Sequence, residues 1–214
     1  MKRQVLVLAL ILAACGGGKE SKTAGSGGGK PLVIEVQSSP TNLDPRVGTD
    51  NVSGRIFDLC CRGLIKVTPN LDYAPDLASW TLPDDKTIVF KLNPNAKFQD
   101  GRPVTAEDVK WTYESLLDPN FVSSKKSGYS AVDHIEAPDP HTIIFKLKEP
   151  NGGIFDNLNM GIVPKGSDAN MLKTKPVAFG PYRVVDYRPD ETVELEAFDG
   201  WIDGPPAIKH LSVK

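Results

Sequence analysis

Three acidic side chains near the middle of the chain are the first candidates for chemistry. Asp100, Glu107 and Asp108 lie close together in the stretch KFQDGRPVTAEDVKWTYESLL, residues 97–117. Carboxylates that converge on one cleft can act as a general acid and base, or they can hold a metal ion. The alternative is that each carboxylate stabilises a turn or a helix end, in which case the cluster binds nothing.

The local pattern favours the structural alternative. Asp100 and Gly101 form a turn pair. Thr105 stands at the N-cap position of a predicted helix, and Asp108 follows three residues later, as in a capping box. Glu107 and Asp108 fall in the first helical turn, where the helix dipole stabilises a carboxylate by about 0.3–1 kcal/mol. We therefore interpret the acids as architecture.

Other patterns of catalysis or metal binding are absent from the sequence. It contains no GxSxG, HExxH, CxxC or Walker motif, and no GxGxxG that leads into a helix. His134, His141 and His210 leave a three-histidine metal site open in principle, but exposed or locally bonded histidines fit their spacing better. We predict no enzyme, no metal site and no cofactor.

Two adjacent cysteines, Cys60 and Cys61, lie in an apolar helical stretch. Neighbouring cysteines cannot form an ordinary disulfide without strain. We expect them to be small buried apolar side chains rather than a redox pair, although the pair remains the alternative.

The first residues have the pattern of an export signal. Lys2 and Arg3 precede an apolar run of about 10 residues, too short to span a bilayer of roughly 30 Å. The run ends in Leu-Ala-Ala before Cys15, which resembles the lipobox of bacterial lipoproteins. We expect a signal peptide at 1–14 and a lipidated Cys15, with a short transmembrane anchor as the alternative. Residues 15–30, rich in Gly and Ser, are predicted to be a flexible tether.

The body of the chain, residues 31–214, is predicted to be a mixed α/β (α+β) domain. Between 135 and 150, Ile143, Phe145 and Leu147 alternate with lysines, which is typical of a strand with one buried face, and residues 81–93 repeat the design. Without residues 1–14 the chain has 23 basic and 27 acidic residues and no basic stripe, so we expect no nucleic-acid partner. The other predicted elements are strands at 31–37, 64–68, 181–198 and 208–214, and helices at 49–64 and 105–117.

Several motifs, taken in order, resemble the solute-binding proteins of peptide/nickel-type ABC importers, the oligopeptide- and dipeptide-binding class. The resemblance covers essentially all of residues 31–214. It rests on APDLASW (74–80), DDKTIVFKLNPNAKFQDGRPVTAEDV (84–109), VDHIEAPDPHTIIFKLKEP (132–150), GIVPK (161–165), FGPYRVVDYRPDETVELEAFDGW (179–201) and IKHLSVK (208–214).

The resemblance implies the first lobe of a periplasmic-binding-protein type II-like fold. Family members have a second lobe after the segment that corresponds to IKHLSVK, and this lobe is absent here. The sequence is then either a fragment or a half-receptor. Within it we expect a sheet subdomain at about 31–65 and 175–214, and an inserted smaller subdomain at about 66–174.

The implied function is extracytoplasmic binding of a peptide for import. Partners would be the ABC permease subunits and the membrane, reached through the lipid anchor, and the protein would be a monomer in the periplasm or at the cell surface. Two alternatives stay open. The same family also binds nickel chelates, opines or oligosaccharides, and a free-standing lipoprotein could bind a protein partner.

The resemblance also assigns binding residues. In the family, the loop after an LDP-like turn reaches into the ligand cleft, and here that loop is LDPRVGTDN, residues 43–51. Capping of the following helix is the alternative role for its last residues, and both roles can hold at once. Looser position matching adds Tyr129 and Met160, for which packing in the core is the alternative role. The predicted ligand-binding residues are Gly48, Thr49, Asp50, Asn51, Tyr129 and Met160.

Overall fold

The computed structural model describes residues 30–214. The predicted signal peptide at 1–14, the lipidation site Cys15 and the predicted tether up to residue 29 lie outside the described residues. Within the described part of the chain, no helix is both long enough and apolar enough to cross a membrane.

One four-stranded sheet brings together the two ends of the described chain. Its strand order is β1-β10-β9-β8, and β1 pairs in parallel with β10, so that Leu32 lies opposite Leu211. The other neighbours are antiparallel. The strands predicted near both ends are confirmed. Their bounds are β1 Leu32–Ile34, β8 Tyr182–Arg188, β9 Thr192–Ala197 and β10 His210–Val213.

A second four-stranded sheet is antiparallel and has the order β4-β5-β7-β6. Ile143, Phe145 and Leu147 point into the core, as their alternation with lysines predicts, and Phe90 on the neighbouring strand is fully buried against them. The strands are β4 Ala78–Asp84, β5 Thr87–Leu92, β6 Val132–Asp139 and β7 Thr142–Leu147.

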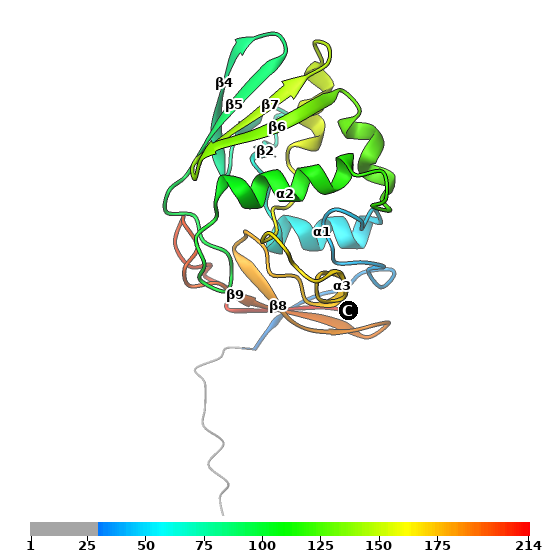
Figure 1. Ribbon diagram of the computed structural model, residues 1–214. Helices are drawn as coiled ribbons and strands as arrows, with labels where there is room; N and C mark the ends of the chain where they lie inside the picture. Colours follow the sequence, from blue (N-terminus) through cyan, green and yellow to red (C-terminus); the bar gives the residue numbers. More distant parts are fainter. Residues whose placement is uncertain (1–29) are drawn as a thin grey trace, which may run out of the picture.

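Two helices lie between the sheets. In Figure 1 the sheet of β4–β7 is at the top, α2 crosses beneath it, α1 lies below α2, and the sheet with β8 and β9 forms the base. One cluster of buried apolar side chains lies around Phe145 and Tyr113, and a second around Ile56 and Leu195. The remaining elements are α1 Asn51–Cys60, α2 Ala106–Leu117, α3 Ala169–Thr174, the 3₁₀ helices η1 Ser124–Tyr129 and η2 Gly152–Asn157, and the hairpin of β2 Ile65–Val67 and β3 Tyr73–Pro75.

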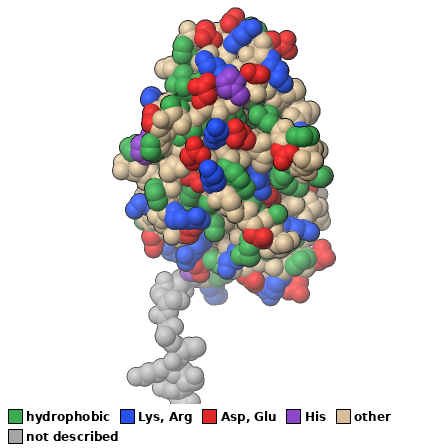
Figure 2. All heavy atoms as spheres, viewed as in Figure 1, with side chains coloured by type: hydrophobic (Ala, Val, Ile, Leu, Met, Phe, Trp, Pro, Cys, Tyr) green, Lys and Arg blue, Asp and Glu red, His purple; other side chains and the backbone are tan. Residues whose placement is uncertain are grey.

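The acidic cluster has the structural role predicted for it. Thr105 and Asp108 form a capping box at the start of α2, and the Asp108 carboxylate also accepts a hydrogen bond from the backbone N–H of Lys165 at 2.8 Å. Glu107 pairs with the Lys165 ammonium at 2.9 Å, and Asp100 pairs with Arg102 at 2.7 Å. Acidic and basic side chains are interspersed over the face shown in Figure 2.

The prediction of two separate thiols at Cys60 and Cys61 is wrong. Both residues are buried, as expected, but the structure joins their sulfur atoms in a disulfide. Helix α1 ends at Cys60, and Cys61 is its C-cap, with φ −137° and ψ 73°. Because the helix ends between them, the two side chains are not held about 100° apart, as the helical repeat would require. The bond links neighbours and therefore staples no distant segments.

Candidate functional site

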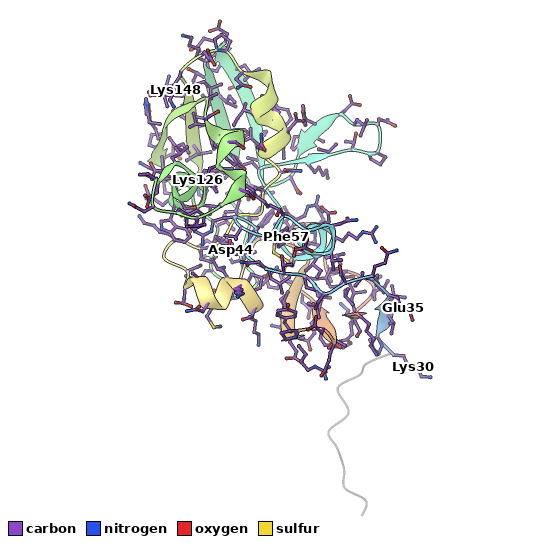
Figure 3. The ribbon with its side chains drawn as sticks, turned by 90° about the vertical axis from the view of Figure 1, so that its right-hand side faces the viewer. Lys30, Glu35, Asp44, Phe57, Lys126 and Lys148 are labelled. Atoms are coloured by element: carbon purple, nitrogen blue, oxygen red, sulfur yellow. A yellow bond between two sulfur atoms is a disulfide. The ribbon has the colours of Figure 1, made fainter. Side chains whose placement is uncertain are left out.

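A cavity of about 530 Å³ opens between the last turns of α1 and the β2–β3 hairpin. Helix α1 contributes Gly54, Phe57 and Asp58, and residues 159–161 close the floor. Figure 3 shows Phe57 on α1 below the projecting hairpin. The helix has two faces: its buried residues pack on the base sheet, and the opposite face borders this cavity. Five of the lining residues are charged, so the wall is more polar than the mostly apolar lining of a typical small-molecule site.

Opposite charges line the mouth of the cavity. The guanidinium of Arg62 donates to the Asp76 carboxylate at 2.7 Å. Burial raises the pKa of Asp76, and the charge of Arg62 opposes this shift. Burial also raises the pKa of Asp58, where Arg62 again acts in the opposite direction. The cavity thus offers both carboxylates and cations to a solute, and Lys66 on β2 adds a further cation.

Lys125 closes one side of the cavity. Its ammonium donates to the backbone oxygen of Pro45 at 2.6 Å and lies 5.2 Å from the centre of the Phe57 ring. Burial lowers the pKa of this lysine, and the charge of Asp44 opposes the shift. A cation that faces an aromatic ring and a carbonyl is held in place, so the side chain of Lys125 is a fixed part of the cavity wall.

A buried ion pair holds the loop that carries Pro45. Arg46 and Asp44 are joined by two side-chain hydrogen bonds of 2.8 and 3.1 Å. The guanidinium lies 4.7 Å from the ring centre of Trp111 and 4.8 Å from that of Phe121. The loop is thereby fixed to α2 and to the segment that follows it.

The residues predicted from the LDP-like loop lie beside the cavity rather than in its wall. Gly48, Thr49, Asp50 and Asn51 precede the first helical residue that lines it, Gly54. Asp50 caps α1 through a hydrogen bond from the Ser53 backbone N–H at 2.8 Å, which is the capping role left open. Gly48 is packed against Asn42 and Phe57, with no room for a side chain.

The two residues added by looser matching have different positions. Met160 lines the cavity. Tyr129 is 2% exposed, and its hydroxyl donates to the Asn157 backbone oxygen at 2.8 Å, which is the core-packing alternative. Sequence reasoning missed Phe57, Asp58 and the other charged wall residues. For Phe57 and Asp58 the signal was the face of α1 opposite its buried side, where Gly54, Phe57, Asp58 and Cys61 recur at spacings of three and four.

We expect Asp50→Ala to lower the free energy of unfolding by about 0.5–2 kcal/mol, since it removes the N-cap of α1. Burial alone would raise the pKa of Asp50, but hydrogen bonds from Ser53 and Thr41 outweigh burial and hold it well below its usual range. The stabilisation is therefore fully present above the unfolded-state pKa of about 3.9 and is lost progressively as the pH falls from there through the lowered folded-state pKa. Urea unfolding of both proteins at pH 7 and at pH 3 measures this; an equal difference at the two pH values would contradict it.

The mixed fold, with its cavity bordered by charged side chains, corresponds to a class of extracellular receptors. The family described as bacterial extracellular solute-binding proteins, family 5, middle region, matches residues 72–214, and the chain belongs to this family. The oligopeptide-binding protein AppA of Bacillus subtilis is 27% identical over 98% of this chain and 42% of its own length. The chain thus spans less than half the length of this relative.

Two solved structures show the same fold. That of AppA from Bacillus subtilis in complex with a nonapeptide matches with a TM-score of 0.82 and 26% identity, over 86% of this chain and 40% of that one. That of NikZ from Campylobacter jejuni in complex with Ni(L-His) matches with a TM-score of 0.79 and 25% identity, over 86% of this chain and 38% of that one. The resemblance to the peptide/nickel class and the expected mixed α/β first-lobe fold are confirmed.

Proposed function

We propose that this chain forms one lobe of a receptor that binds a peptide outside the cytoplasm and delivers it to an ABC permease. The observation that carries the proposal is the cavity beside α1, in a chain of family 5. Its wall presents carboxylates, from Asp58 and Asp76, near cations, from Arg62, Lys66 and Lys125. A peptide is a zwitterion with apolar side chains, so it can satisfy both kinds of charge and contact Phe57.

The cavity supplies one wall of such a site. In a two-lobed receptor a ligand stabilises the closed state by the difference between its affinities for the closed and open states. A second lobe would cover the open side of this cavity, exclude water and add contacts. We therefore expect the present chain to bind peptide weakly, with a dissociation constant of about 0.1–1 mM.

The wider organisation follows from the same proposal. We propose that residues 31–65 and 175–214 form the sheet subdomain and residues 66–174 an inserted one. The separate apolar clusters around Leu195 and Phe145 follow this division in the main, with Leu64, Ile65 and Phe179 packed in the second cluster and Val163 and Leu172 in the first. We further propose that lipidated Cys15 holds a monomeric receptor at the membrane surface, in the periplasm or at the cell surface.

A nickel chelate is the second candidate, favoured by the similarity to NikZ, whose structure holds Ni(L-His). Within residues 30–214 no group of three His, Cys, Asp or Glu side chains could hold a metal ion. Such a cargo would therefore be bound through the organic ligands of the metal, for which the charged groups of the cavity are also suited.

Native mass spectrometry of the full chain with a tripeptide library tests the proposal. We expect retained peptides, and we expect Asp58→Asn to weaken their binding by about ten- to a hundredfold, because a hydrogen bond to a charged group contributes about 1.5–3 kcal/mol. Asp85→Asn, at an exposed turn away from the cavity, is the matched control and should change nothing. No peptide bound at millimolar concentration, together with retention of Ni(L-His), would replace the first candidate with the second.

A further inference from the structure

The disulfide of Cys60 and Cys61 lies where the two apolar clusters meet. Both cysteines belong to the cluster on the base sheet, whereas Leu64 and Ile65, just beyond them, belong to the cluster under β4–β7. The intervening Arg62 ties two other segments together through its backbone. Its N–H donates to the oxygen of Phe179 at 2.6 Å, and its oxygen accepts from the N–H of Ile162 at 3.0 Å.

Backbone closes two sides of the disulfide. A Cβ atom at Gly161 would lie 2.7 Å from the Cβ atom of Cys61, and one at Gly180 would clash with the backbone oxygen of Cys60. The same oxygen accepts a hydrogen bond of 2.6 Å from the side-chain amide of Gln99, which is itself buried. Backbone therefore packs against the pair from two sides.

The disulfide is also part of the cavity wall. Cys61 lines the cavity, and its neighbour Arg62 reaches from the same wall to Asp76. A small reductant that enters the cavity would thus meet the Cys61 side of the bond. Any shift of Cys61 also moves Arg62, because a peptide bond joins these two residues.

We propose that the Cys60–Cys61 disulfide is a redox-sensitive site that fixes Arg62 in the cavity wall. That this disulfide regulates peptide binding rests on the proposed function of the cavity. A dithiol reductant would attack one sulfur as a thiolate, form a mixed disulfide and release the other cysteine. Its second thiol would then displace the remaining protein sulfur. The protein gains two electrons and two protons and becomes a dithiol, and the reductant becomes a disulfide.

Reduction should loosen the wall for a steric reason. Two thiols need more space than one disulfide, because each gains a hydrogen atom and the unbonded sulfurs must keep van der Waals distance. Since backbone at Gly161 and Gly180 closes two sides, the separating sulfur atoms are directed toward the cavity, and Cys61 and the adjoining backbone of Arg62 move with them. The hydrogen bonds of Arg62 with Phe179 and Ile162 should then open more often.

Hydrogen exchange of the full chain carrying Cys15→Ser, with and without dithiothreitol, tests the proposal. Without reductant we expect no reaction of the unfolded protein with maleimide. With reductant we expect two reactive thiols, and about tenfold faster exchange at the amides of Arg62 and Ile162. Two thiols without reductant, or unchanged exchange after reduction, would overturn the proposal.

The matched control is the variant that also carries Cys60→Ala and Cys61→Ala, whose exchange should not respond to dithiothreitol. If that variant does not fold, reoxidation of the reduced parent protein provides the control, since slow exchange should return with the disulfide.

Binding of a tripeptide library in both redox states separates the two proposals. We expect binding about three- to tenfold weaker after reduction. Absence of peptide binding in either state would reject the proposed function, whereas the exchange result alone decides the redox proposal.

Discussion

Asp44→Ala should lower the free energy of unfolding by about 3–5 kcal/mol, because it leaves a buried guanidinium without its counter-charge. Asp44 and Arg46 are both 3% exposed in their side chains, so water cannot replace the lost carboxylate. The stacking of Arg46 on Trp111 and Phe121 keeps the guanidinium in this position. Urea unfolding at pH 7, followed by circular dichroism, measures the loss.

An exposed ion pair provides the matched control for Asp44→Ala. Glu196 pairs with Arg183 at 2.8 Å, with side chains 34% and 51% exposed. Glu196→Ala should therefore cost less than about 1 kcal/mol. Replacing both buried partners, with Asp44→Leu and Arg46→Met, should recover part of the stability, because no unpaired charge is then buried. A loss in Asp44→Ala no larger than in the Glu196 control would show that the buried pair does not hold the loop.

Phe145→Ala should have a comparable effect on stability, a loss of about 3–5 kcal/mol. The ring of Phe145 is fully buried, 5.7 Å from that of Phe90 and 5.2 Å from that of Tyr113, both in edge-on geometry. Its removal creates a cavity between β7 and α2 and eliminates both aromatic contacts. The unfolding midpoint in urea measures this change.

Val122→Ala is the control for truncation of an apolar side chain. Val122 is 87% exposed, so its loss should change the free energy of unfolding by less than about 0.5 kcal/mol. If Phe145→Ala resembled this control, the sheet of β4–β7 would not pack on α2 as the structure shows.

The sequence predicts those parts of the fold that depend on local patterns. The alternation of Ile143, Phe145 and Leu147 with lysines is enough to assign a strand and its buried face. The spacing of Thr105 and Asp108 is enough to place the start of α2. In both cases the residues that carry the signal are within a few positions of one another, so periodicity and capping chemistry suffice.

The wall of the candidate site depends on contacts between distant segments and could not be predicted in this way. Lys125 meets Pro45 across 80 positions of sequence, and Arg62 meets Asp76 across 14. Neither pair belongs to a local motif. The LDP-like loop indicated the neighbourhood of the cavity and contributes Pro45 to it, but the predicted residues of the loop are not in the wall, to which the next turns of α1 contribute instead. The disulfide was missed because its formation depends on where α1 ends.

The pairing of β1 with β10 determines the order in which the two sheets can form during synthesis. All four strands of the β4–β7 sheet lie within residues 78–147. The pairs β4–β5 and β6–β7 are hairpins of strands that follow one another in the sequence. The base sheet joins Leu32 to Leu211, a pairing of high contact order that cannot exist before the residues of β10 are available. The strands of the β4–β7 sheet can therefore pair first. Until β8 arrives, the apolar residues of α1 that pack on the base sheet remain uncovered, and the chain then depends most on chaperones to avoid aggregation.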